Sequence, residues 1–215
     1  MKVIASFFSF ILLTSGIVNA QQSIETKNPY VQLGNKALMD GDFKSAVTHL
    51  EKSMPDASNN ADVLYMLAYS YYHSNNYAKA ISTFGQVVSL KPNQIMAYYY
   101  RGKARNILGS QMNSTLTPAE REKLLLASIK DYTKALEIST ADQKASLYYQ
   151  NRAISYRDYA ILKSQKNSKI YDKLSAQNYY KLCINDLQYV LDANPGRKDI
   201  MDEMKKAKVY MANIE

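Results

Sequence analysis

Hydrophobic positions recur along the chain with the spacing that amphipathic helices require. One apolar stripe consists of Leu64, Leu67, Ala68 and Tyr71. Another, near the C-terminus, has charged residues on the opposite face and consists of Ile200, Met204, Ala207 and Met211. Helix breakers are scarce, with 7 Gly and 5 Pro among 215 residues. The pattern predicts an all-α protein.

The helical pattern repeats with a period of 34 residues. The clearest copy covers residues 61–93, and small residues stand at one position of successive copies, namely Gly34, Ala68 and Gly102. These residues resemble the tetratricopeptide repeat, a helix-turn-helix unit in which small side chains lie where the two helices touch. The resemblance covers nearly all of the chain after its first residues and implies a right-handed α-solenoid.

The resemblance also implies how the chain is divided. We expect one domain, residues 21–215, made of about four repeat units and a C-terminal capping helix that covers the last exposed core. The expected units are approximately 27–60, 61–94, 95–140 and 146–196, and the expected capping helix is 197–213.

Units three and four are longer than the repeat requires, by about 14 and about 18 residues. Thr117 and Glu120 form a capping box with Pro118 at the first helical position, which predicts a helix that starts early. Ser168 predicts a weaker start of the same kind in unit four. We therefore expect elongated helices in both units, longer by about two turns and projecting beyond the rest of the solenoid.

The first twenty residues have the composition of a secretory signal peptide. Lys2 precedes an apolar run from Val3 to Leu13, and the segment ends in Val18-Asn19-Ala20, where Ala20 is the small residue typical of a cleavage site. The run is too short to span a bilayer, and no second run follows, so we expect no transmembrane span. These features predict a protein that is exported to the periplasm or secreted. The sole cysteine, Cys183, has no partner for an intramolecular disulfide.

Two charged positions appear together in units three and four. In each first helix one residue directly precedes the small residue at the helix contact. This residue is leucine in the first two units but Arg101 and Arg152 in the last two. In the second helices of the same two units, one position that is not acidic in the first two units is occupied by Asp131 and Asp186. Because an unpaired, half-buried arginine is costly, we interpret these residues as structural ion pairs, Arg101 with Asp131 and Arg152 with Asp186.

A stripe of tyrosines is rotated away from the apolar stripe of the first helices. In the tetratricopeptide family this second stripe lines the concave groove, and the resemblance implies a partner-binding surface made of Asn35, Tyr65, Tyr69, Tyr72, His73, Tyr99 and Lys103. Tyrosine offers a large contact area with few rotamers to lose, which suits the binding of a peptide or a helix. The alternative is that these tyrosines pack on neighbouring first helices.

Positive charge is concentrated in one part of the chain. The formal net charge is +8, and residues 101–173 hold fourteen Lys and Arg against seven Asp and Glu. A basic tip is expected at the projecting end of unit four, made of Lys163, Lys166, Lys169 and Lys173. Lysines at helix ends are usually solvated surface, but they also attract acidic proteins and anionic surfaces.

The residue content favours binding over catalysis. The chain has 2 His and no metal-ligand or nucleophile spacing, so we expect no enzyme activity, no metal and no cofactor. Nucleic-acid binding does not suit an exported protein. The leading hypothesis is a non-catalytic scaffold that holds a protein or peptide partner of the cell envelope in the groove. The alternative is a charge-driven binder of an anionic envelope polymer, a lipid surface or an acidic protein through units three and four.

Overall fold

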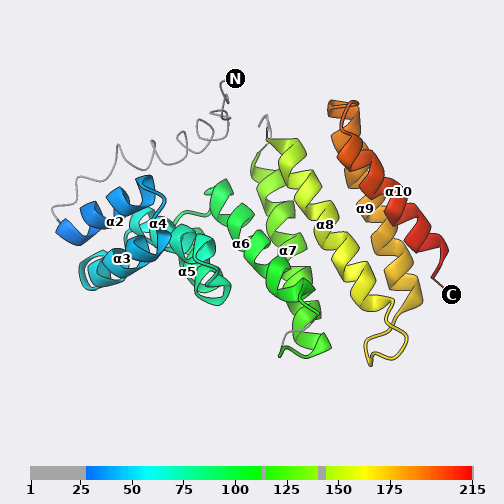
Figure 1. Ribbon diagram of the computed structural model, residues 1–215, viewed down its shortest axis with the longest axis horizontal. Helices are drawn as coiled ribbons and strands as arrows, with labels where there is room; N and C mark the ends of the chain where they lie inside the picture. The colour runs from blue at the N-terminus through cyan, green and yellow to red at the C-terminus, as the bar shows by residue number, and fades with distance from the viewer. Residues whose placement is uncertain (1–27, 113–114, 140–143, 215) are drawn as a thin grey trace, which may run out of the picture.

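The computed structural model describes residues 28–112, 115–139 and 144–214, and within these ranges the chain forms nine α-helices and no strand. The expected signal peptide, residues 1–20, lies outside the described residues. Figure 1 shows the helices stacked in chain order as an elongated row, from α2 at one end to α10 at the other.

The helices form antiparallel pairs that follow the expected units. Each helix packs against the one before it and the one after it, and the first helices of neighbouring pairs also touch, α2 with α4, α4 with α6 and α6 with α8. The first helices therefore share one side of the stack, which we call the concave face. The helices are α2 Pro29–Met39, α3 Phe43–Ala57, α4 Ala61–His73, α5 Tyr77–Leu90, α6 Ile95–Ser110, α7 Pro118–Ile138, α8 Ala145–Lys163, α9 Lys173–Ala193 and α10 Lys198–Ala212.

The repeat is visible in the turns of units one and two. Gly41 and Asn75 stand 34 residues apart, follow α2 and α4, and both have positive φ, at 75° and 63°. Glycine and asparagine are the residues that adopt this left-handed conformation most readily. Gly109 stands at the same position of unit three but does not form a turn, because α6 continues to Ser110.

The helices of units three and four are elongated. α7 and α9 have 21 residues each and α8 has 19, whereas α4 has 13 and α5 has 14. The capping box at the start of α7 is present, with the Thr117 hydroxyl accepting from the Glu120 amide and the Glu120 carboxylate accepting from the Thr117 amide. At about 1.5 Å per residue, α7 is about 12 Å longer than α4.

The expected helix start at Ser168 is wrong. α9 begins at Lys173, and its N-cap is Asp172, whose carboxylate accepts from the Ser175 amide at 2.9 Å. The Asp172 amide in turn donates to the carbonyl of Lys163 at 2.9 Å. This bond closes residues 164–172 into a compact connection, so residues 169–172, where the start of a helix was expected, belong to that connection.

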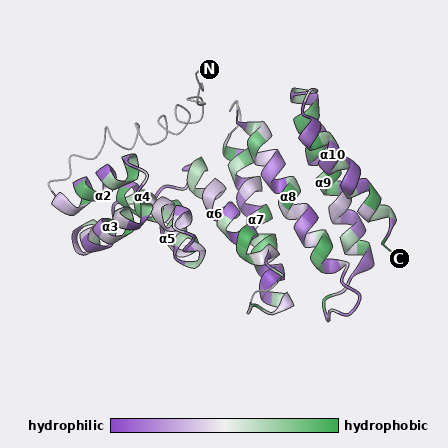
Figure 2. Ribbon diagram, in the orientation of Figure 1, coloured by the Kyte–Doolittle hydropathy of each residue, from purple (hydrophilic) through white to green (hydrophobic). Residues whose placement is uncertain are grey.

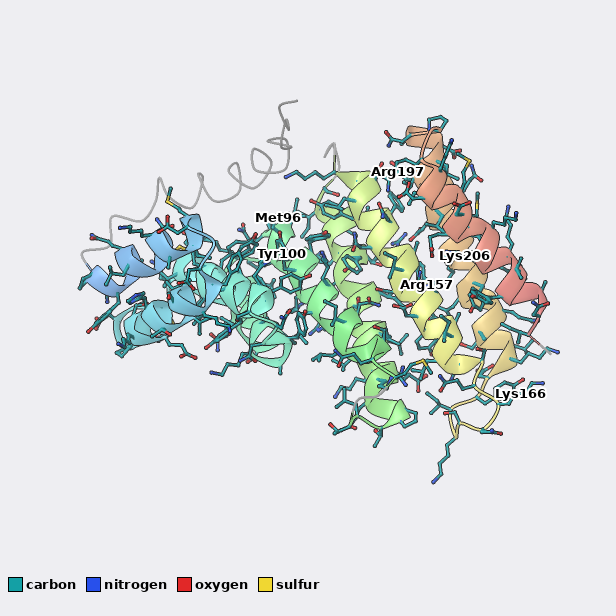
Figure 3. All side chains as sticks on the ribbon, in the orientation of Figure 1. Met96, Tyr100, Arg157, Lys166, Arg197 and Lys206 are labelled. Carbon is teal, nitrogen blue, oxygen red and sulfur yellow. The ribbon has the colours of Figure 1, made fainter. Side chains whose placement is uncertain are left out.

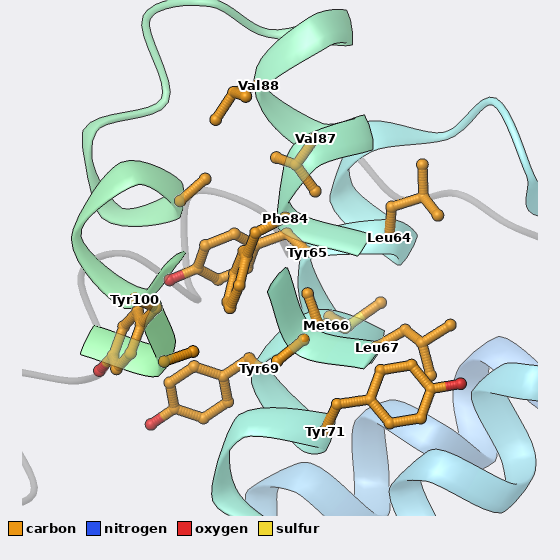
Figure 4. Packing of buried hydrophobic residues seen from close by; sticks show 14 of the residues in the cluster. Leu64, Tyr65, Met66, Leu67, Tyr69, Tyr71, Phe84, Val87, Val88 and Tyr100 are labelled. Atoms are coloured by element: carbon orange, nitrogen blue, oxygen red, sulfur yellow. The ribbon is translucent and has the colours of Figure 1, made fainter. Parts of the chain in front are cut away.

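The core is unusually rich in tyrosine. Figure 2 shows apolar and polar residues alternating along each helix, as expected for helices with one buried face. Figure 4 shows Phe84 in a cluster with Tyr65 and Tyr100, whose ring centroids lie 5.7 Å and 6.1 Å from that of Phe84. Aromatic pairs at such distances add to the stability gained from burial.

Gly109 marks a close contact between α6 and α7. A Cβ atom there would lie 2.8 Å from Cγ of Leu125 and 3.1 Å from the backbone oxygen of Arg121. The Arg121 guanidinium donates from Nε to the Gly109 carbonyl at 2.9 Å and from Nη2 to the Ser110 carbonyl at 3.3 Å. The arginine thereby satisfies two carbonyls at the end of α6.

Replacing Gly109 with alanine should lower the free energy of unfolding by about 1–3 kcal/mol, because a backbone atom and a buried leucine cannot both move aside. The matched control is Gly85, in the middle of α5, where a Cβ meets only the tip of the Arg101 side chain at 3.8 Å. Gly85→Ala should raise stability by about 0.5–1 kcal/mol through helix propensity. Urea melts of both variants measure the difference, and equal shifts would contradict the packing described for Gly109.

The C-terminal helix α10 covers the end of the solenoid. Ile200 and Ala207 are buried against α9, while Met201, Val209 and Tyr210 are exposed. Arg157 of α8 donates to Glu203 of α10 at 2.7 Å and so links the helix to unit four as well. Within the described residues, no helix is long and apolar enough to cross a membrane.

Candidate functional site

Arg101 of α6 and Asp131 of α7 form an ion pair inside unit three, as expected from the sequence. Nε of Arg101 lies 3.2 Å and 3.0 Å from the two carboxylate oxygens, and Nη2 lies 2.6 Å from Oδ1. Arg105, which the sequence analysis did not include, donates to Oδ2 at 2.6 Å. One buried carboxylate therefore holds two guanidinium groups.

Arg152 of α8 and Asp186 of α9 form the corresponding pair in unit four. Nε and Nη2 of Arg152 donate to the two carboxylate oxygens at 2.8 Å and 2.9 Å. The guanidinium lies over the rings of Tyr149 and Tyr156, at 5.3 Å and 5.6 Å from their centroids. Nη1 also donates to the Thr133 hydroxyl at 3.1 Å, so Arg152 joins the two helices of its unit through contacts within the chain.

Three of the seven groove residues are in the core, which corrects that part of the expected site. Tyr65, Tyr69 and Tyr99 are only 8%, 6% and 6% exposed. Their rings contact neighbouring first and second helices, as shown by Tyr69–Tyr100 at 5.0 Å and Tyr99–Tyr148 at 5.8 Å. The first helices lie close enough for tyrosines on this stripe to fill the space between them.

The other groove residues remain accessible on the concave face. Asn35 and Tyr72 are half-buried and His73 is exposed. The His73 ring is stacked on Phe43, with centroids 4.6 Å apart and planes at 21°. Lys103 of α6 reaches across to α4, with Nζ 5.6 Å from the centroid of Tyr72 and 5.5 Å from that of Tyr99. Tyr72, His73 and Lys103 therefore form one cluster.

Lys103 carries a positive charge that the protein does not neutralise. Its ammonium group is half-buried between two tyrosine rings, and within the described residues it makes no ion pair or hydrogen bond. Burial lowers the pKa of Lys103 below its ordinary value. Cation–π contacts offset part of this cost, and an anion from a partner would offset more.

His73 provides a pH-dependent probe of the cluster. Although one side of the ring is exposed, partial desolvation by the neighbouring aromatic rings, and then the charge of Lys103, lower the pKa of His73 below 6.5. Because the folded protein favours neutral imidazole, the contribution of His73 to stability is complete above pH 6.5 and is lost as the pH falls. An NMR titration should give a midpoint below 6.5, and Lys103→Met should raise it partway. A midpoint at or above 6.5 in the wild-type protein would contradict the environment described.

The concave face continues through a polar chain that the sequence analysis missed. Nδ2 of Asn106 donates to Asp158 at 3.0 Å, Arg157 donates to Asp158 at 2.9 Å, and Arg157 also binds Glu203 of α10. Figure 3 labels Arg157 on α8, facing the C-terminal helix. The signal was present in the repeat register, because Asn106 and Arg157 occupy the position that Tyr72 holds in unit two.

The basic tip is smaller than expected. Lys163 is only 9% exposed, and its Nζ lies 3.2 Å from Oε1 of Glu122, which also accepts from the Tyr159 hydroxyl at 2.8 Å. Lys163 is thus an internal contact between α8 and α7. Lys166, Lys169 and Lys173 are exposed at this end of the molecule, where Figure 3 labels Lys166.

Other reactive groups are placed in the core. Cys183 is buried between α8 and α10, and burial raises its pKa to about 12, which keeps the thiol protonated and unreactive. A cavity of about 60 Å³ beside it is lined by Ala153, Leu187 and Ile200, among others. In the part of the chain that the structure describes, no three His, Cys, Asp or Glu side chains are grouped as metal ligands.

Several solved structures are similar to this chain, and no curated protein matches it. An O-GlcNAc transferase mutant from Thermobaculum terrenum is 15% identical with a TM-score of 0.43, and the aligned part covers 77% of this chain but only 27% of the transferase. Two structures of MamA are each 19% identical, with TM-scores of 0.37 and 0.38, and the alignments cover 73% and 77% of this chain and 95% and 93% of theirs.

The sequence model of the tetratricopeptide repeat family matches residues 37–105, which run from the last residues of α2 through α3, α4 and α5 into α6. Proteins of this family generally mediate protein–protein interaction and are generally not catalysts. The described chain has an all-α fold, a helical solenoid of the tetratricopeptide type.

Proposed function

We propose that this protein is an exported, non-catalytic interaction module that holds a protein or peptide partner of the cell envelope on its concave face. The proposal of export rests on the signal-peptide pattern of residues 1–20. The proposal of binding rests on the solenoid fold and on the cluster formed by Tyr72, His73 and Lys103.

The observation that carries the proposal is the unneutralised charge of Lys103. The ammonium group is held between two rings on a face that is otherwise aromatic and polar, and no group of the described chain pairs with it. A partner that places a carboxylate there would gain a charge-assisted contact next to aromatic surface. We therefore expect the bound segment to contain an acidic residue.

The proposal is tested by capture of the partner with purified mature protein as bait. Extracts of the source envelope are mildly crosslinked, and the captured proteins are identified by mass spectrometry. Lys103→Glu and Tyr72→Ala should each reduce capture at least tenfold, since each removes part of the cluster that would meet the carboxylate. The circular-dichroism melts of both variants should stay close to that of the wild type.

The matched control is Lys134→Glu, which makes the same charge change on the exposed surface of α7. Capture by this variant should equal capture by the wild type. Undiminished capture by Lys103→Glu, or equal losses in Lys103→Glu and Lys134→Glu, would refute the concave face as the binding surface.

A further inference from the structure

The projecting end of units three and four exposes large apolar side chains. Leu174, in the first turn of α9, is 76% exposed, and Met112, just after α6, is 72% exposed. These are the two most exposed large hydrophobic residues that the structure describes, and Tyr171, in the connection before α9, is 36% exposed. Figure 1 shows that the α6–α7 and α8–α9 connections lie at the same end of the stack.

Three lysines flank Tyr171 and Leu174 in the sequence. Lys166, Lys169 and Lys173 are all exposed within eight residues of Leu174. In residues 164–174 these three lysines are accompanied by one carboxylate, Asp172, so the segment carries a formal charge of +2. The end of the molecule therefore combines excess positive charge with exposed apolar surface.

The protein holds this arrangement in place. Ile170, next to Tyr171, packs on a small core of Leu125, Tyr159 and Leu162 from α7 and α8. The bond from the Asp172 amide to the Lys163 carbonyl fixes the base of the connection. With Ile170 turned inward, Tyr171 and Leu174 are exposed on the outside of an ordered connection.

We propose that this end of the molecule, comprising Leu174, Tyr171, Met112 and the three exposed lysines, binds the surface of an anionic lipid bilayer. The lysines would meet the phosphate groups, and the apolar side chains would enter the boundary between headgroups and acyl chains. Lysines alone would suffice for an acidic polymer or an acidic protein surface. The neighbouring apolar side chains are what favour a bilayer, since its anionic phosphates and its apolar acyl chains lie within the reach of one side chain.

This surface shares no residue with the concave face, so the two proposals can fail separately. The lipid test uses purified mature protein with vesicles of phosphatidylcholine alone and of phosphatidylcholine mixed with phosphatidylglycerol. The protein should co-sediment with the mixed vesicles and not with phosphatidylcholine alone, and binding should weaken as salt is added.

Three lysine-to-glutamate changes at Lys166, Lys169 and Lys173 should abolish co-sedimentation, since each lysine near an anionic bilayer is worth about fivefold in binding. The control makes the same three changes at exposed Lys36, Lys44 and Lys52 in unit one. The control variant should retain most of the binding. Equal losses in the two triple variants would show attraction by total charge only and would overturn the assignment of this surface.

Insertion is tested by fluorescence, because the chain contains no tryptophan. In a Leu174→Trp variant the emission should shift to shorter wavelength with mixed vesicles, whereas a Leu90→Trp variant, at an exposed position in unit two, should show no shift. Leu174→Ser should weaken vesicle binding about tenfold and leave binding to heparin unchanged. An unshifted Leu174→Trp emission in sedimented protein, or equal loss of vesicle and heparin binding in Leu174→Ser, would overturn the bilayer proposal in favour of an anionic polymer.

Discussion

Replacing Asp131 with alanine should lower the free energy of unfolding by about 3–5 kcal/mol. The carboxylate is buried and is the ion-pair partner of both Arg101 and Arg105, so its removal leaves two half-buried guanidinium groups with unsatisfied charge. The free energy of unfolding of Asp131→Asn should lie between those of the wild type and Asp131→Ala, because the amide keeps the side-chain volume and can still accept a hydrogen bond. Equilibrium urea unfolding of the three proteins measures the effect.

The control for Asp131 is Lys134→Ala on the same helix, which removes an exposed pair with Glu137 and should change stability by no more than about 0.5 kcal/mol. A loss below about 1 kcal/mol for Asp131→Ala would mean that the arginines reach solvent or another acceptor. That result would contradict the internal pairing that we assign to unit three.

Replacing Phe84 with alanine should lower the free energy of unfolding by about 3–5 kcal/mol. The ring is fully buried in α5 and contacts Tyr65 of α4 and Tyr100 of α6, so the cavity would open where units two and three meet. Phe84→Leu keeps most of the volume and should cost less than about 2 kcal/mol.

Hydrogen exchange shows whether Phe84→Ala destabilises only the neighbouring helices or the whole protein. In a solenoid each unit contacts only its neighbours, so amides of α4, α5 and α6 should lose the most protection and those of α9 and α10 the least. A uniform loss of protection over all helices would contradict this view and indicate one globally cooperative core.

Much of the fold could be predicted because the repeat register carries structural meaning. Small residues such as Gly34 and Gly102 mark helix contacts, and a Cβ on Gly102 would lie 3.1 Å from the Tyr132 ring. The joint appearance of Arg101 with Asp131 indicated a contact between residues 30 positions apart, which no local pattern contains. The capping box at Thr117 was recognisable because its bonds are all within one turn.

The candidate site was harder to predict because it depends on distances between units. The tyrosine stripe has the same spacing whether it faces solvent or a neighbouring helix, and only the close approach of α4, α6 and α8 places Tyr65, Tyr69 and Tyr99 in the core. Lys163 was assigned to the surface because helix ends usually carry solvated lysines, but Glu122 comes from another unit. Asn106 and Arg157 stand at the repeat position of Tyr72 but are not aromatic, so the tyrosine stripe gives no sign of them, and their partners Asp158 and Glu203 include residues of other units.

The proposal that the concave face binds a protein partner is tested most directly by photo-crosslinking in the source cells. A photoreactive amino acid is placed either at Tyr72, on the concave face, or at Ser82, which is exposed on the second helix α5. We predict a discrete crosslinked protein from position 72 that is absent from position 82 and is lost when Lys103→Glu is added. The same product from both positions, or a product from position 82 alone, would contradict the account.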